Sequence, residues 1–286
     1  MHTTASDGRL APVELVARVA AAGLTTLSVT DHDTVASIAE VTGAAQASGI
    51  RVVPGIEVTA VDEGRDLHVL GYFFDPLSER LAAFLLNQRS ARVSRVREIV
   101  SRLAAAGLVI DADGLVASAA SRPGSSLGRP QIAREMVRAG QVGSVQEAFD
   151  VWLAAGRPAY VPRTGPSPAT VIDVVHDAGG VASFAHPGVS KRDELIAPLV
   201  EHGLDAIEVY HPDHTAEHTA AYRAMAARLG TAISGGSDFH GEDTGQPGRA
   251  YRSVGAVTLP VEAFSELEAR TASRRHNDGG QAAKRD

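Results

Sequence analysis

Histidine, aspartate and glutamate side chains recur in this sequence at the points where apolar segments end. Imidazole together with carboxylate favours zinc, manganese or iron, and argues against a calcium site built only from oxygen ligands. The residues concerned are His32, Glu57, His68, His186, Asp238 and His240, in the segments SVTDHD, VVPGIEV, DLHVL, ASFAHP and ISGGSDFH.

Several such ligands together indicate more than one ion. Two divalent ions about 3.5–4 Å apart can activate a bridging hydroxide and hold a phosphate in line for attack. The pattern therefore predicts a site for phosphoester hydrolysis. One such histidine alone is more typical of a loop or a core than of a metal site, but their shared placement favours ligands. The sequence leaves His176, His202 and His276 outside the site, because they fall in helical segments or in the C-terminal tail.

Short apolar runs alternate with segments of helical period, which predicts a parallel α/β architecture. Strands are expected in LTTLSV, IRVVPGIEVTA, DLHVLGYFF, VASFA, LDAIEVY and GTAISGG, and helices over residues 12–22, 34–48 and 168–177. In a parallel barrel the carboxyl ends of all strands meet on one face. Ligands far apart in the sequence can therefore share one centre.

The sequence divides into two parts of a barrel and an insert between them. We expect residues 1–74 and 167–272 to form the barrel, residues 75–166 to form a helical insert, and residues 273–286 to be disordered. The insert is expected because a long helical pattern and three shorter ones follow one another there without a strand of comparable strength.

The composition excludes several classes of protein. The 286 residues carry a net charge of −7, which argues against binding to long nucleic acids. There is no cysteine, so disulfides and thiolate zinc sites are excluded. No apolar run is long enough to span a membrane, and the start lacks the pattern of a signal peptide. A cytoplasmic protein is expected. The sequence does not indicate an oligomeric state.

The segments HTTASDG, TDHDT, PGIEV, LHVLGY, AHPG and GSDFHG, in this order, resemble the polymerase and histidinol phosphatase (PHP) family. The resemblance covers residues 1 to about 265, including the insert, and implies a distorted seven-stranded βα barrel with a trinuclear metal site. It is greatest to stand-alone phosphoesterases of small nucleotides. These remove the 3′-phosphate of nucleoside 3′,5′-bisphosphates, and some relatives degrade short RNA from the 5′ end.

The resemblance also implies a ligand set for two to three manganese, iron or zinc ions. His2, Glu57 and Asp238 would bind the first ion; Glu57, His68 and His186 the second; and Asp7, His32 and His240 the third. A bridging hydroxide would attack phosphorus. Asp238, His240 and His186 are the expected catalytic residues, because a histidine or aspartate of the cluster, or the third ion, could protonate the leaving 3′-oxygen.

Substrate contacts are expected from the insert and from one strand end. In SLGRPQIAREMV, Arg129 precedes a helix that begins with Pro130, where a guanidinium and a helix N-terminus could hold the 5′-phosphate, with Ser126 nearby. A purely structural role for Arg129 is the alternative. His211, in EVYHPDH, is as compatible with substrate contact as with a polar loop.

The family pattern begins with a short strand followed by Asp-Leu-His-x-His. Met1 takes the x position here, so the first strand and its histidine are expected to be absent from this sequence. A start codon placed too late is favoured over a short, impaired form.

The expected function is hydrolysis of nucleoside 3′,5′-bisphosphates. The alternatives are 5′–3′ exonuclease activity on short RNA, histidinol-phosphate hydrolysis, a non-catalytic accessory module, and hydrolysis of carbon–nitrogen bonds. The last of these would not need an arginine as a phosphate anchor.

Overall fold

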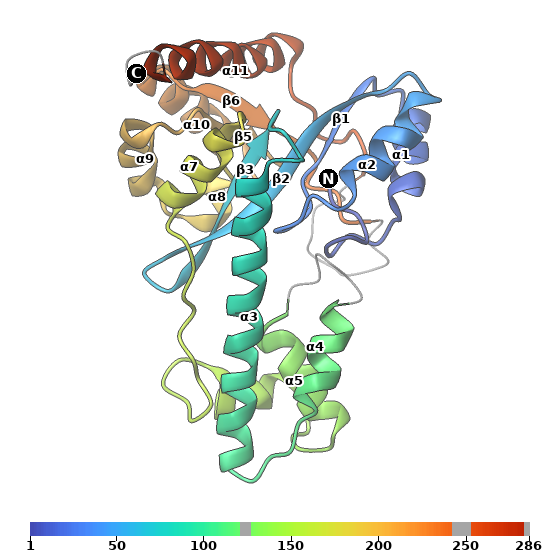
Figure 1. Ribbon diagram of the computed structural model, residues 1–286, viewed down its shortest axis with the longest axis vertical. Helices are drawn as coiled ribbons and strands as arrows, with labels where there is room; N and C mark the ends of the chain where they lie inside the picture. The colour runs from blue at the N-terminus through green and yellow to red at the C-terminus, as the bar shows by residue number, and fades with distance from the viewer. Residues whose placement is uncertain (121–126, 242–252, 283–286) are drawn as a thin grey trace.

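The protein consists of a curled sheet covered by helices and a helical insert that extends from one side of it, as the computed structural model shows (Figure 1). The structure describes residues 1–120, 127–241 and 253–282. In these residues six strands form one sheet, in the order of the chain: β1 (Thr26–Val29), β2 (Arg51–Asp62), β3 (Arg65–Tyr72), β4 (Val181–Phe184), β5 (Ala206–Tyr210) and β6 (Ala232–Gly235).

The α/β prediction is confirmed, but the prediction of a parallel strand arrangement fails at β3. This strand is antiparallel to both of its neighbours, whereas β1–β2, β4–β5 and β5–β6 are parallel pairs. The reason is local: Glu63 and Gly64 have φ of 47° and 77°, so they form a two-residue turn that folds β3 back on β2. A count of seven strands is not reached in the described residues.

Helices cover the sheet on its outer side. They are α1 (Pro12–Ala21), α2 (Ile38–Gln46), α7 (Pro168–Asp177), α8 (Pro187–Ser190), α9 (Ile196–His202), α10 (Ala216–Leu229) and α11 (Val261–Ala282), with a 3₁₀ turn at Asp193–Leu195. Ser167 caps α7, where its hydroxyl accepts a hydrogen bond from the N–H of Thr170. Ile56, Val69 and Phe184 are fully buried between the sheet and these helices.

The last helix extends into the segment for which we expected disorder. We predicted disorder from residue 273, but α11 continues to Ala282 and lies along β6 (Figure 1). Among the described residues, no helix is both long and apolar enough to cross a bilayer.

The insert has its own core. It contains α3 (Glu79–Ala105), α4 (Ala112–Ala120), α5 (Arg129–Arg138), α6 (Val145–Glu147) and a π-helical segment (Ala148–Leu153). Leu103, Ile132 and Met136 are fully buried within it. At its start, α3 instead places Leu81 in the core of the sheet. This one helix therefore connects two separate cores.

Candidate metal centre

Glu57 lies at the middle of a cluster of imidazole and carboxylate groups at one end of the sheet. Its side chain, in the buried part of β2, is 4 % exposed. Its Oε1 lies 2.6 Å from Nδ1 of His68 and 3.1 Å from Nε2 of His186. Its Oε2 lies 3.2 Å from Nε2 of His2. The two oxygens of one carboxylate therefore face different imidazoles.

Three overlapping groups of potential ligands surround this carboxylate, and within each group the ligand atoms lie within 4.8 Å of one another. One group matches the set expected for the first ion, and another contains the set expected for the third. The groups are His2–Glu57–Asp238, His32–Glu57–His68 and His2–Asp7–His32–His240.

His186 is the one expected ligand outside these groups, and it lies beside the second one. Its Nε2 is 3.2 Å from Nδ1 of His68 and 3.1 Å from Oε1 of Glu57. The structure thus brings all the predicted ligand residues together. Their assignment to individual ions remains a prediction.

The ring of His2 fits a metal ligand better than a hydrogen-bonded side chain. It is 1 % exposed, and among the described residues neither ring nitrogen has a hydrogen-bond partner. Nε2 nevertheless lies 3.2 Å from a carboxylate oxygen of Glu57 and 3.2 Å from one of Asp238. Around a tetrahedral ion with ligand bonds of about 2.0–2.1 Å, ligand atoms lie about 3.3 Å apart. The residues therefore fit a divalent cation.

Two histidines of the cluster retain a proton when no metal is bound. Burial lowers the pKa of His2, but the carboxylates of Asp238 and Glu57 outweigh it and raise the pKa to about 9. Burial acts in the same direction on His186, and Glu57 and Glu208 again raise the pKa to about 9. A divalent ion would take the place of these protons.

The carboxylates stay ionised, and one histidine stays neutral. Burial acts to raise the pKa of Glu57, but His68 and His32 hold it well below its usual value. The histidines around Asp7 and Asp238 likewise lower the pKa of each carboxyl group against the effect of burial. Burial lowers the pKa of His32 to about 4. The cluster therefore offers carboxylates and a neutral imidazole, as metal binding requires.

A sequence model of the PHP domain matches residues 1–152, which is more than half of the chain. The chain belongs to the PHP domain family. We refer to the cluster around Glu57 as the PHP centre.

Two similar proteins match this chain over most of its length and most of their own. The chain is 32% identical over 280 residues to a 3′,5′-nucleoside bisphosphate phosphatase of Chromobacterium violaceum, covering 94% of this chain and 95% of the relative. It is 35% identical over 246 residues to the 5′-3′ exoribonuclease Rnm of Escherichia coli, covering 84% and 83%. A candidate metal-dependent phosphoesterase from Bifidobacterium adolescentis has a similar structure, with a TM-score of 0.74, 33% identity and 94% of both chains covered. The prediction of a metal-dependent phosphoric ester hydrolase is confirmed.

Two buried carboxylates that the sequence did not single out hold the PHP centre in place. Asp31, 1 % exposed, accepts hydrogen bonds from the N–H and hydroxyl of Thr3 and from the hydroxyls of Ser6 and Ser37. It thereby fixes the loop that follows His2. Its position directly before His32, at a strand end, was the available signal.

Glu208 performs the same task for His186. Its carboxylate accepts a hydrogen bond of 2.7 Å from the main-chain N–H of His186. This bond supports a strained backbone, since His186 has φ of 28°, in the left-handed region. Asp238, after β6, also has a positive φ of 44°. Such strain concentrates at functional sites. Glu208 lies in β5, in the segment IEVYHPDH, just as Glu57 lies in β2. This shared position within a strand was the available signal for Glu208.

The expected substrate-binding residues fall in different places. His211 is in the PHP centre, where its Nε2 lies 3.4 Å from Oδ2 of Asp238. Arg129 is the first residue of α5 in the insert and is not part of the cluster. Ser126 lies outside the described residues. His176 and His202, expected outside the site, pair with Asp205 and Asp173 instead.

Proposed function

We propose that the chain hydrolyses the 3′-phosphate of nucleoside 3′,5′-bisphosphates, with two to three manganese, iron or zinc ions held by the PHP centre. The observation that carries this proposal is a pair of adjoining cavities. One, of 480 Å³, lies over the PHP centre and includes His32 in its wall. The other, of 350 Å³, also includes His32, together with Arg89 and Arg92 of α3. Two adjoining cavities suit a substrate larger than one phosphate group, such as a nucleotide; Arg129 lines neither of them.

The residues of the PHP centre differ in their exposure to solvent. His2 and Glu57 are almost completely buried, whereas the side chains of Asp7 and His240 are 49 % and 30 % exposed. Bound divalent ions supply Lewis acidity to the phosphate and lower the pKa of a coordinated water. His240 faces the open side, so with two ions bound it is the residue we assign to protonate the leaving 3′-oxygen; as a ligand of a third ion it would have no proton to give. Asp238 and His186 lie deeper and hold the centre.

We assign the 5′-phosphate to Arg129 at the start of α5. Its guanidinium lies over the rings of Phe149 and Tyr160, at 6.0 Å and 5.5 Å from their centroids, and its Nη1 donates to the carbonyl of Leu153 at 3.3 Å. These contacts orient a cation at a helix N-terminus, which is a favourable place for a phosphate. Ser126, three residues earlier, is a further expected contact.

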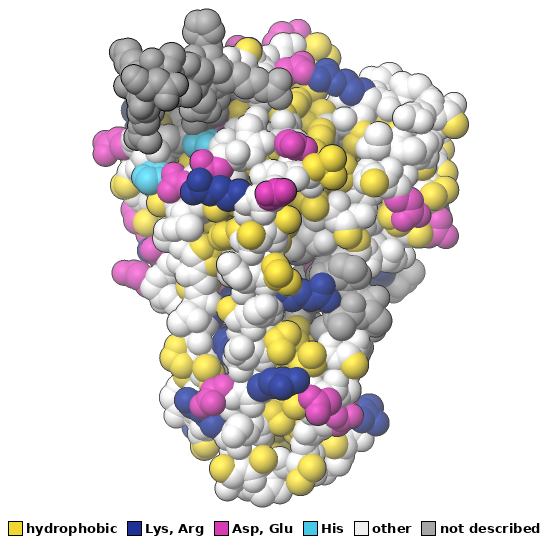
Figure 2. Space-filling view, viewed as in Figure 1, with side chains coloured by type: hydrophobic (Ala, Val, Ile, Leu, Met, Phe, Trp, Pro, Cys, Tyr) yellow, Lys and Arg dark blue, Asp and Glu magenta, His cyan; other side chains and the backbone are white. Residues whose placement is uncertain are grey.

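Positive charge is concentrated around Arg129. Burial, and then the guanidinium groups of Arg129 and Arg163, lower the pKa of Arg95. The guanidinium groups of Arg129 and Arg163 are therefore close enough to Arg95 to act on its pKa. Figure 2 shows Lys and Arg side chains (dark blue) on the face that displays α3 and the insert, in a chain whose net charge is −7. Asp and Glu side chains (magenta) lie among them on the same face, so the support for an anionic group of the substrate at the insert rests on Arg95, Arg129 and Arg163.

The test is phosphate release in the presence of manganese, with nucleoside 3′,5′-bisphosphates, 5′-monophosphates, short RNA and histidinol phosphate compared. We expect the bisphosphate to be the preferred substrate. Arg129→Ala should raise KM for the bisphosphate about tenfold to 100-fold with kcat little changed, because a charged hydrogen bond to the bound ground state is lost.

Arg138→Ala is the matched control. Arg138 lies on the same helix, is 74 % exposed and pairs with Glu135 at the surface, so its loss should leave KM unchanged. Preferential cleavage of short RNA from its 5′ end would replace the bisphosphate proposal with the exonuclease. Preference for histidinol phosphate, or equal KM values for the two variants, would contradict the assigned 5′-phosphate site.

A further inference from the structure

The one-turn helix α8 follows His186 directly, and its first main-chain donors need acceptors. His186 is the N-cap residue of α8, but its side chain makes no capping hydrogen bond, and its ring lies beside Glu57 instead. Pro187, the first residue of α8, has no N–H. The N–H of Gly188 is therefore the first donor of this turn that an N-cap side chain would normally satisfy.

A histidine from another part of the chain supplies this acceptor. The N–H of Gly188 donates to Nε2 of His214 at 3.2 Å. Nδ1 of the same ring lies 2.8 Å from the carbonyl of Val209 in β5. Because a carbonyl only accepts, Nδ1 carries the proton and Nε2 accepts. Burial lowers the pKa of His214, which keeps the ring neutral, as this arrangement requires.

The ring of His214 is itself held from several sides. It lies just before α10, whose start is capped by the hydroxyl of Thr215. Its centroid lies 5.3 Å from that of His211 and 5.2 Å from that of Tyr222, which is buried. The hydroxyl of Tyr222 donates to Oδ1 of Asp193 at 3.1 Å, in the 3₁₀ turn that follows α8. His214 and α10 thus bond to the chain within α8 and again beyond it.

Gly188 allows the ring to approach the main chain this closely. A Cβ at this position would lie 2.8 Å from Cδ2 of His214 and 3.1 Å from Nδ1 of His218. Two carbon atoms do not approach to 2.8 Å unless one of them moves. Glycine is therefore the residue that fits here while His214 keeps its place.

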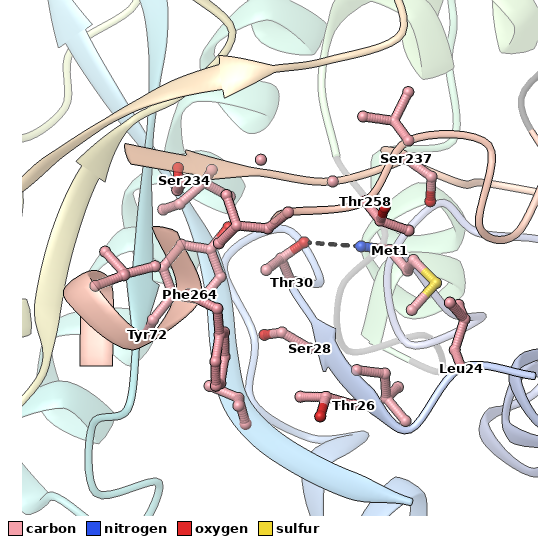
Figure 3. A pocket seen from close by; sticks show the side chains of 18 of the residues that line it. Met1, Leu24, Thr26, Ser28, Thr30, Tyr72, Ser234, Ser237, Thr258 and Phe264 are labelled. Atoms are coloured by element: carbon pink, nitrogen blue, oxygen red, sulfur yellow. Dashed lines mark hydrogen bonds between the residues drawn. The ribbon is translucent and has the colours of Figure 1, made fainter. Parts of the chain in front are cut away.

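On its other side, the turn that carries His186 borders open space. His186 and Glu208 both line a cavity of 510 Å³. Figure 3 shows this cavity, with Tyr72 and Ser234 among its walls. The cavity gives the turn no packing on that side, so the hydrogen bonds to Glu208 and His214 carry more of its support.

The position of this turn determines where the imidazole of His186 lies. The φ of 28° at His186 is a strained value that the surrounding bonds must maintain. Glu208 accepts the N–H of His186, and His214 accepts the N–H two residues later. We propose that His214 is a positioning residue for His186, and so for the second ion of the PHP centre. This role rests on His186 as a ligand of the proposed metal site, not on which phosphate ester is hydrolysed.

The test compares manganese affinity in the parent, His214→Gln and His214→Leu, all as the full chain. Gln places an amide oxygen near the position of Nε2, whereas Leu fills the space without an acceptor. Loss of an outer-sphere partner lowers metal affinity by about 10–100-fold. We expect a loss of about tenfold or more in His214→Leu, and His214→Gln should stay within about threefold of the parent.

His218→Leu is the matched control. The ring of His218 also faces Gly188, but its Nδ1 accepts the N–H of Thr215, at 3.4 Å. Manganese affinity of His218→Leu should therefore stay within about twofold of the parent.

Hydrogen exchange in the metal-free chain measures the bond itself, so failure of the metal site and failure of the positioning role can be told apart. The amide of Gly188 should exchange about tenfold faster in His214→Leu than in the parent, and His214→Gln should restore the slower rate. The amide of Ile207 in β5 is the reference for a folded sheet.

Gly188→Ala gives a second test that keeps His214. The added methyl group should displace the ring and weaken manganese binding. In a His214→Ala background the same methyl group should have little further effect, because the space of the ring is then open. This comparison holds even where His214→Leu does not fold.

Manganese affinity of His214→Leu within about twofold of the parent would overturn the proposal. So would a His214→Gln chain that binds as weakly as His214→Leu with Ile207 protected in both, or additive losses when Gly188→Ala and His214→Ala are combined. A parent chain that binds no manganese while its Gly188 amide is protected would refute the metal site, and the positioning role with it.

Discussion

The carboxylate of Asp31 accepts a hydrogen bond of 2.7 Å from the main-chain N–H of Thr3, and this bond attaches the N-terminal loop to the end of β1. The same carboxylate also accepts hydrogen bonds from the hydroxyls of Thr3, Ser6 and Ser37. Asp31 contacts no expected metal ligand in these bonds, yet it flanks His32 and fixes the residue after His2. It is therefore a positioning residue for two sides of the PHP centre.

Asp31→Ala should destabilise the fold by roughly 2–4 kcal/mol, because several buried donors lose their acceptor at once. It should also lower manganese affinity, because the loop with His2 and Asp7 is released. Urea unfolding and a manganese titration measure the two effects. Asp62→Ala, at the far end of β2, is the comparison variant, and equal manganese affinity of the two variants would show that Asp31 does not position the centre.

Glu57→Gln should weaken metal binding more than any other single change at the PHP centre. Its two oxygens face different imidazoles, and it is an expected ligand of the first and the second ion. The substitution therefore removes one negative charge from the sites of both ions. We expect a loss of affinity above about 100-fold, the upper end of the effect of outer-sphere substitutions. Metal content after dialysis measures it. His202→Ala, at the surface beside Asp173, is the control and should retain the metal content of the parent chain.

The pH dependence of stability should reverse sign when metal is added. His2 and His186 have pKa values raised to about 9, so without metal their contribution is complete below about pH 6.5 and is lost as the pH rises to 9. His32, with its pKa lowered to about 4, makes the metal-free chain less stable as the pH falls from 6.5 to 4. Metal-free stability should therefore be greatest near pH 6.5.

The pH dependence of metal binding is opposite to that of metal-free stability, because the ion must displace the protons of His2 and His186. Apparent manganese affinity should rise between pH 6.5 and 9, with release of about two protons per chain. Thermal unfolding with and without manganese, across this range, separates the two curves. A metal-free chain that becomes more stable from pH 6.5 to 9 would contradict the assignment of protons to these histidines.

The ligand cluster could be predicted because metal chemistry restricts the residue types and because strand ends place them on one face. The residues that position the ligand cluster could not be predicted. Asp31 and Glu208 are acceptors for buried donors, and in a sequence such carboxylates look the same as ligands or surface groups. The parallel sheet was predicted from a strand–helix rhythm, and it fails at β3 because the two-residue turn at Glu63 and Gly64 leaves no crossover helix. A period-two pattern does not distinguish the two strand directions.

The separate core of the insert leads to a last prediction. Leu103→Ala should destabilise the insert by about 2–5 kcal/mol, because a fully buried side chain leaves a cavity among Ile132, Met136 and Leu153. The sheet has its own core, so manganese affinity should stay within about twofold of the parent. Under the proposed function, KM for the bisphosphate should rise, because Arg129 is carried by the insert. Hydrogen exchange of α5 measures the stability of the insert, and a manganese titration measures the affinity of the PHP centre. Val109→Ala is the control, because Val109 is 74 % exposed. Loss of manganese binding in Leu103→Ala would show that the two cores unfold together.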